Sequence, residues 1–203
     1  RDAAGNYSGY TGASVTADLM EYADDTAAQA AYVVGGTLTV HSEASIKTQG
    51  SFALTGIATT GDLNSTLTRT LGSTIDMSNR HSVSFDIRSV RIGGNIKVGL
   101  HDSGGTTTEI TPNITAANTF QVVTWDISGV TNADKDTIDQ IIITVVNADA
   151  ANTFYVDNMI ALAHDSATTS ATTVPMTTNI SPTSRIVGSG QFTMTVNGTD
   201  FIG

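Results

Sequence analysis

The amino-acid sequence predicts an all-β protein built as an antiparallel sandwich, and two observations carry that prediction. Apolar residues recur mostly at every second position, which is the period of a strand with one buried face. Turn-forming residues separate the alternating segments at short intervals, as at Gly35-Gly36, Gly93-Gly94 and 103–105. Many short strands with frequent turns are typical of a sandwich or a barrel.

The clearest strand is 82–88, where Val83, Phe85 and Ile87 share one face. The segment 95–101 alternates in the same way. The other expected strands are 37–41, 51–58, 63–71, 106–111, 120–127, 139–147 and 152–162. We expect these residues to be largely buried: Phe85, Ile87, Val98, Leu100, Val123, Trp125, Ile141, Ile143 and Tyr155. A register shift of one residue would turn a whole apolar set outward, so the alternation predicts the core.

Two short segments predict helix. The alanine-rich segment 24–33 follows an aspartate that can cap its first turn. The segment 131–138 predicts a single turn ahead of the next strand. Because no long helical pattern occurs elsewhere, α/β folds are disfavoured.

Composition excludes several classes of function. The net charge is −10 with only nine Lys and Arg, so a phosphate-tracking stripe cannot form and neither nucleic acid nor an anionic membrane surface is an expected partner. The chain has no cysteine, which excludes disulfides and thiolate metal sites. No apolar run approaches the length of a membrane span. The four histidines stand apart and no nucleophile elbow occurs, so we expect no enzyme.

The composition changes along the 203 residues in a way that predicts three parts. The first, 1–162, is long enough for one large β domain. A Ser/Thr-rich stretch without periodicity, 163–174, is expected to be a linker. A new alternation then begins in 175–203, which is too short for a sandwich of its own.

Several motifs in the first part occur in a characteristic order. The segment 18–24 reads Asp-Leu-Met-Glu-Tyr-Ala-Asp, and His-Ser-Glu at 41–43 precedes Gly-Ser-Phe-Ala-Leu at 50–54. Trp-Asp-Ile-Ser-Gly stands at 125–129, and Phe-Tyr-Val-Asp-Asn-Met at 154–159. In this order the motifs resemble galactose-binding-like jelly-roll modules, a group that contains many carbohydrate-binding modules of bacterial glycanases. The resemblance implies a jelly-roll sandwich that binds glycans outside the cell, in a secreted or surface protein, without catalysis.

The resemblance also implies a structural Ca²⁺ ion that joins the two ends of the domain. The positions that match the ligands of such modules are Glu21, Glu43 and Asp157, with Asp18 and Asp24 as further candidates. Carboxylates and backbone carbonyls are the oxygen ligands that calcium takes. The alternative is that these acids are strand-end residues that bind nearby backbone groups.

The polar faces of two strands supply the candidate glycan-binding residues. Asp86 and Arg88 alternate with the apolar side of 82–88, and Lys97 and His101 do so in 95–101. Such modules usually present their sugar-binding surface as the polar face of one sheet. The alternative is a solvated sheet face without a ligand.

Aromatic residues offer a second way to bind sugar, by stacking. The single tryptophan, Trp125, shares a strand face with apolar neighbours and is therefore expected in the core. Tyr7, Tyr10, Tyr22 and Tyr32 lie outside the strand patterns and could be exposed for stacking.

The tail carries a separate resemblance. Asn-Ile-Ser-Pro-Thr-Ser at 179–184 and the alternating segment 190–201 resemble the first strands of an immunoglobulin-like (IPT/TIG-like) repeat, a spacer in large bacterial surface and adhesion proteins. This resemblance favours a glycan-binding or adhesion module of a larger surface protein. The alternative is a structural subunit of a filament, surface layer or phage appendage that binds other copies of itself, for which unpaired strands in 175–203 would provide the contact.

Overall fold

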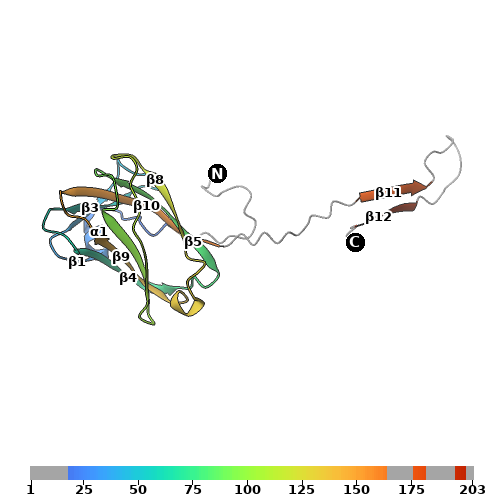
Figure 1. The fold of residues 1–203 in the computed structure, drawn as a ribbon, viewed down its shortest axis with the longest axis horizontal. Helices are drawn as coiled ribbons and strands as arrows, with labels where there is room; N and C mark the ends of the chain where they lie inside the picture. Colours follow the sequence, from blue (N-terminus) through green and yellow to red (C-terminus); the bar gives the residue numbers. More distant parts are fainter. Residues whose placement is uncertain (1–17, 164–175, 182–194, 200–203) are drawn as a thin grey trace. The chain divides into compact units, whose positions relative to one another are not determined.

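The computed structural model describes residues 18–163, 176–181 and 195–199 (Figure 1). The chain divides into two compact units, Arg1–His164 and Asp165–Gly203, which are treated separately below. The expectations for Tyr7, Tyr10 and the linker beyond residue 163 lie outside the described residues.

The first unit contains two antiparallel five-stranded sheets, which confirms the predicted sandwich. Sheet A has the strand order β1-β4-β9-β6-β7 and sheet B the order β2-β3-β10-β5-β8. The strands of sheet A are β1 (Val33–Gly35), β4 (Thr66–Ile75), β9 (Ile138–Val145), β6 (Ile96–Asp102) and β7 (Thr107–Ile110). Those of sheet B are β2 (Thr39–Glu43), β3 (Ala53–Ala58), β10 (Asn152–Ala163), β5 (Arg80–Ser89) and β8 (Gln121–Asp126).

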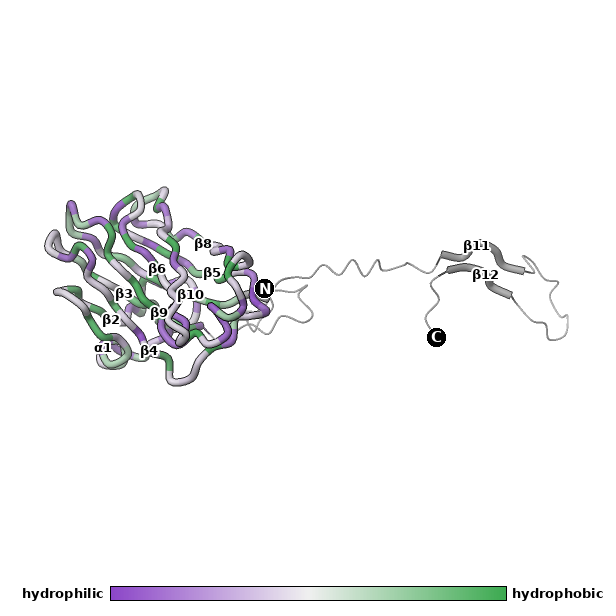
Figure 2. Tube along the Cα trace, turned by 60° about the horizontal axis from the view of Figure 1, so that its bottom comes forward, coloured by the Kyte–Doolittle hydropathy of each residue, from purple (hydrophilic) through white to green (hydrophobic). Residues whose placement is uncertain are grey.

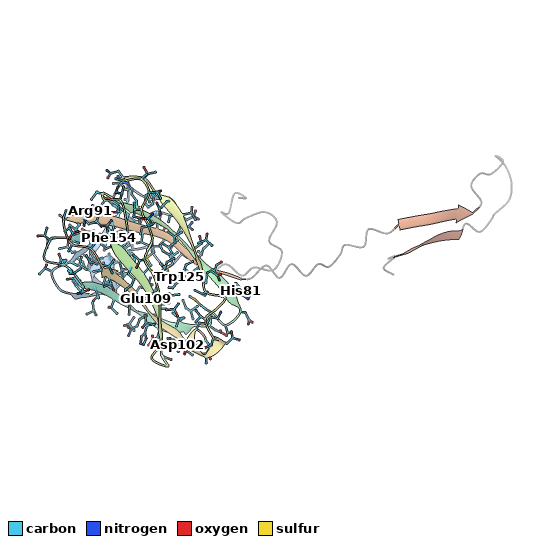
Figure 3. The ribbon with its side chains drawn as sticks, in the orientation of Figure 1. His81, Arg91, Asp102, Glu109, Trp125 and Phe154 are labelled. Carbon is cyan, nitrogen blue, oxygen red and sulfur yellow. The ribbon has the colours of Figure 1, made fainter. Side chains whose placement is uncertain are left out.

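One apolar core fills the space between the sheets. Hydrophilic and hydrophobic residues alternate along many of the strands (Figure 2), as expected where each sheet buries one face. Phe154 of β10 and Trp125 of β8, both labelled in Figure 3, belong to this core and are at most 5% exposed. All nine residues expected in the interior are buried.

Tyr155 is buried for a different reason from the rest of that set. Phe154 and Val156 alternate with it and belong to the core, so Tyr155 points to the outward face of sheet B. There it pairs with Arg88 across the β5–β10 ladder. The period of two correctly predicted that Tyr155 is buried, but it did not predict that the burial occurs on the outward face of the sheet instead of in the core.

Helix α1 (Asp25–Ala31) forms where the sequence predicts it. The Asp24 side chain accepts a hydrogen bond from the backbone N–H of Ala27 at 2.8 Å and caps the helix. Tyr22 precedes the helix and Tyr32 follows it, and the Tyr22 hydroxyl donates a hydrogen bond to the Tyr32 hydroxyl at 3.0 Å. Both tyrosines are buried, so the expectation that they stack on sugar is wrong. The turn expected near 131–138 is a 3₁₀ helix, η1 (Asn132–Asp134).

The second unit is described only in part. Strand β11 (Met176–Ser181) pairs antiparallel with β12 (Thr195–Thr199) in a two-stranded sheet. Most of the segment that resembles an immunoglobulin-like repeat lies outside the described residues, so that resemblance stays a prediction. Among the residues that the structure describes, no helix has the length and apolar character needed to span a membrane.

Candidate functional site

The four residues predicted to bind glycan lie on opposite sides of the sandwich. Asp86 and Arg88 come from β5 in sheet B, whereas Lys97 and His101 come from β6 in sheet A. Each alternates with core residues, so each points away from the core on its own sheet. The four side chains therefore cannot form one site, and the two sheets have to be considered separately.

The outward face of sheet A is rich in polar side chains, and we call it the polar face. The strand register arranges its residues in three rows that cross the strands. Most of these side chains are partly rather than fully exposed, because neighbours on both sides shield them. The first row contains Thr66, Thr144 and Lys97; the second contains Thr68, Ile142, Gly99 and Glu109; the third contains Thr70, Gln140, His101 and Thr107.

Gly99 lies at the centre of the middle row. A Cβ atom added there would meet Thr107 Cγ2 at 3.2 Å, Glu109 Cγ at 3.5 Å and the Ile142 carbonyl oxygen at 3.7 Å. Gly99 is itself buried, so the Thr107 and Glu109 side chains pack closely over its backbone, and the partly exposed Ile142 is its neighbour on β9. The outer rows place polar side chains on both sides of Ile142 and Gly99.

Two pairs of charged or titratable residues are held on and beside the polar face. Lys97 Nζ lies 2.8 Å from Glu109 Oε1, and His101 Nδ1 lies 2.7 Å from Asp139 Oδ1. His101 and Asp139 are both partly buried, so their contact fixes their orientation more firmly than the more exposed Lys97–Glu109 pair is fixed. The face thus presents hydrogen-bond donors and acceptors at fixed places.

Sheet B presents a different surface, because a loop covers part of it. The sequence predicted Asp86 to lie on an accessible polar face, but its side chain is buried. It lies beside Asp157 in the β5–β10 ladder. The Thr48 hydroxyl donates to Oδ2 of Asp86 and lies 3.0 Å from Oδ2 of Asp157. Loop 44–52, which contains Thr48, thereby binds over the two carboxylates.

The three predicted calcium ligands all contact this loop. Glu21, Glu43 and Asp157 each accept backbone N–H hydrogen bonds from loop 44–52. The donors are Ser51 and Phe52 for Glu21, Ser45 and Ile46 for Glu43, and Thr48 and Gln49 for Asp157. Within the described residues, no three acidic or histidine side chains gather at one point that could hold a metal ion. The arrangement is therefore not a formed calcium cage.

Asp18 joins the buried carboxylates through Asn158. The backbone N–H of Asn158 lies 3.2 Å from Asp18 Oδ2 and 2.8 Å from Asp157 Oδ1. A β-bulge in β10 makes this contact, and Asn158 has a φ of 52°, which asparagine tolerates better than most residues. Burial raises the pKa of Asp18 to about 6; the N–H of Met20 opposes the rise, and the charge of Asp157 adds to it. Asp24 serves as the helix cap instead.

Sequence reasoning missed most of the polar face. Thr68, Gln140 and Ile142 lie on strands that were expected from 63–71 and 139–147, and the same alternation would have assigned them to an outward face. The pattern does not say which strands share a sheet, so the residues could not be grouped. Thr48 carried no signal, and Asn158 was noted only as part of the motif at 154–159, because their roles depend on the loop and the bulge.

Comparisons with known proteins support the fold. No family model matches the chain, and no curated protein matches it. Among solved structures, it is similar to the family 30 carbohydrate-binding module of a cellulosomal cellulase from Clostridium thermocellum, at 15% identity, covering 74% of this chain and 99% of that one, with a TM-score of 0.54. It is similar to the agarase AgWH50C at 12% identity, covering 66% of this chain and 24% of that chain, with a TM-score of 0.51. A family 11 carbohydrate-binding module from Clostridium thermocellum, in complex with a β-1,3-1,4-linked tetrasaccharide, is 18% identical, covering 65% and 87%, with a TM-score of 0.48. At these identities the likeness is one of fold: the first unit is a jelly-roll β-sandwich.

Proposed function

We propose that the first unit is a non-catalytic glycan-binding module of a secreted or surface protein, and that it binds a neutral glycan on the polar face of sheet A. The observation that carries the proposal is the middle row, in which the partly exposed apolar Ile142 lies beside Gly99, between two rows of polar side chains. A pyranose ring presents C–H groups on its faces and hydroxyl groups at its edge. Ile142 offers the C–H groups an apolar contact, and the bordering rows offer hydroxyl groups hydrogen-bond partners.

The composition of the face favours neutral sugars over charged ones. Lys97 is paired with Glu109 and His101 with Asp139, so the surface has no unmatched positive charge for a polyanion. The net charge of −10 works in the same direction. Of the three solved structures described above, the one with the highest TM-score is named as a carbohydrate-binding module, which agrees with a sugar ligand for this fold.

Affinity electrophoresis through gels containing neutral polysaccharides tests the proposal. We expect at least one polysaccharide to retard the chain, and Gln140→Ala and Gly99→Val to weaken that retardation at least tenfold. Thr124→Ala, an exposed threonine on the outward side of β8 in sheet B, is the matched control and is expected to bind like the unmodified chain. Retardation by none of the polysaccharides, or equal retardation of all variants, would contradict the proposal.

The calcium ion implied by Glu21, Glu43 and Asp157 remains part of the proposal. What supports it is the concentration of negative charge: Asp18, Asp86 and Asp157 all bind groups of Thr48 or Asn158. None of the ion pairs between described residues includes these aspartates. A divalent cation would offset their repulsion, provided that loop 44–52 rearranges to offer carbonyl oxygens instead of N–H groups.

A second candidate function is self-assembly, and the second unit favours it. Its described strands, β11 and β12, pair only with each other. A two-stranded sheet is marginally stable in water, so it gains from further strands. Light scattering after gel filtration separates the candidates. Multimers that become monomers when 164–203 are deleted would favour assembly, and monomers in both cases would count against it.

A further inference from the structure

Arg88 is held over the Tyr155 ring on the outward face of sheet B, and part of its guanidinium group has no partner among the described residues. Its guanidinium carbon lies 4.8 Å from the centre of the Tyr155 ring, within the range of a cation–π contact. Nε donates to the Asn118 carbonyl oxygen at 2.9 Å, and Nη2 lies 3.5 Å from Asn118 Oδ1. Among the described residues, Nη1 has no hydrogen-bond partner and Arg88 has no ion-pair partner.

The supports of Arg88 are themselves fixed. Asn118 has a φ of 59°, and its N–H donates to the Ser89 carbonyl oxygen at 2.7 Å, which ties its loop to the end of β5. The Phe120 ring meets the Tyr155 ring edge-on, with the ring centres 6.5 Å apart. The guanidinium plane is thus oriented before any ligand arrives, which lowers the entropy lost on binding.

The neighbours of Arg88 on this face are mainly apolar. Val90, just beyond the end of β5, is 39% exposed; Val122 lies opposite Asp86 on β8, diagonal to Arg88 on the same face, and is 69% exposed. Asp86 is the only acid beside it on β5, and loop 44–52 covers that side chain. A positive charge with apolar surroundings attracts an anion more strongly than the same charge in open water.

From this geometry we propose that Arg88 is a receptor for the carboxylate of a uronic-acid residue in an oligosaccharide, at a second site on sheet B. Planar guanidinium groups bind carboxylates through two parallel N–H···O bonds, and Arg88 retains free N–H groups at Nη1 and Nη2 for this. The exposed Val122 and Val90 side chains provide apolar contact for the C–H groups of the sugar ring. The proposal does not depend on the polar face, which lies on the other sheet.

The test is a titration of the isotope-labelled full chain with trigalacturonate, followed by backbone amide shifts in the NMR spectrum. Chelator is present, because calcium could bridge carboxylates without any receptor. We expect saturable shifts centred on Arg88, Asn118 and Val122, which weaken as salt is added. The carboxyl-reduced trisaccharide is expected to leave these amides unchanged. A parallel titration with a triglutamate peptide distinguishes a uronate receptor from a site for acidic protein segments, and we expect it to bind more weakly than trigalacturonate.

Variants assign the effect to the arginine. Arg88→Gln is expected to lower the affinity for trigalacturonate at least tenfold, and Arg88→Lys to lower it severalfold, because lysine lacks the planar fork. Lys47→Gln, the same charge change in loop 44–52, is expected to leave the affinity within twofold. If Arg88→Gln loses the fold, Val122→Glu tests the site from an exposed position and is expected to weaken binding similarly. The proposal would be overturned if Arg88→Gln and Lys47→Gln bound trigalacturonate equally, or if Val122→Glu bound it as well as the unmodified chain. Binding of triglutamate as tight as that of trigalacturonate would also overturn it.

Discussion

Asp62 offers a sharp test of how the end of the sandwich is held together. Its side chain is fully buried and accepts hydrogen bonds from Thr37 in one segment and from Thr59 and Ser65 in another. Thr37 donates its N–H at 3.0 Å and its hydroxyl at 2.7 Å; Thr59 donates the same two groups at 2.7 and 2.8 Å; the Ser65 hydroxyl donates at 3.1 Å. One carboxylate thus joins the β1–β2 connection to the β3–β4 connection.

We expect Asp62→Ala to lower the free energy of unfolding by about 3.5 kcal/mol. Each of the two backbone N–H groups loses its acceptor at a cost of about 1 kcal/mol, since Thr37 and Thr59 are exposed enough for water to replace part of the bond. The three hydroxyl bonds contribute roughly 0.5 kcal/mol each. For a domain of this size, that loss lowers Tm by about 7–14 °C. Asp62→Asn keeps the shape and one acceptor oxygen, so it should cost about half as much.

The effect should depend on pH with a definite sign. Burial opposes ionisation of Asp62, but the hydrogen bonds from Thr37 and Thr59 outweigh it and hold the pKa below its usual value. The folded-state pKa is therefore below the unfolded one, so the contribution is fully present above about pH 4 and declines as the pH falls further. Urea unfolding followed by the fluorescence of the buried Trp125 measures this. A loss under 1 kcal/mol at pH 7, or a gap between Asp62→Ala and the unmodified chain that does not narrow at pH 3, would refute the reasoning.

Four further predictions follow from the structure. The pKa of Asp18 is raised to about 6, so between about pH 4 and 6 the folded chain binds more protons than the unfolded chain. The free energy of unfolding should therefore fall by on the order of 1–2 kcal/mol as the pH rises through this window. Urea titrations at each pH measure this fall, which should be smaller in Asp18→Ala. If Glu21, Glu43 and Asp157 bind Ca²⁺, Tm should rise with added Ca²⁺ and fall with chelator. At a hundredfold excess of Ca²⁺ over Kd the free energy of unfolding should increase by about 2.7 kcal/mol, and Asp157→Asn should remove this increase. Identical melting curves with Ca²⁺ and with chelator would count against the ion. Gly56→Ala should destabilise the fold by about 2–3 kcal/mol in urea unfolding, because the new Cβ would lie 2.1 Å from Phe154 Cζ; unchanged stability would mean that Phe154 can move aside. Deleting 164–203 should leave the Tm of the first unit within about 2 °C by calorimetry, since the two units are separately compact; a larger drop would show that they share a core.

The strands were largely predictable from the sequence, because one buried face imposes a period of two. All the expected strands occur within a few residues of their expected bounds, and so does helix α1 with its Asp24 cap. Strand β1 was missed, since Val33–Gly35 is too short for an alternation and directly follows the helix. The local sequence pattern is sufficient to predict a strand or helix when the burial and hydrogen bonds that form it depend on one segment alone.

The sites were less predictable because they depend on how segments meet. Asp86 and Lys97 carry the same local signal, a polar residue between core residues, yet they lie on different sheets. The burial of Asp86 depends on Thr48, which is 38 positions away in the chain. Pairing between distant strands and the path of loop 44–52 are not encoded in the period of either strand, so no reading of single segments could have grouped these residues.

The most direct test of the central claim is to locate a bound neutral glycan on the sandwich. Backbone amide shifts of the isotope-labelled chain, titrated with the oligosaccharide of whichever neutral polysaccharide retards it most, report the contact surface residue by residue. The account predicts that the largest shifts occur in 66–70, 97–101, 107–109 and 140–144, the segments that form the polar face of sheet A. Shifts confined to sheet B or to the loops at the ends of the sandwich would contradict it, as would the absence of any saturable shift.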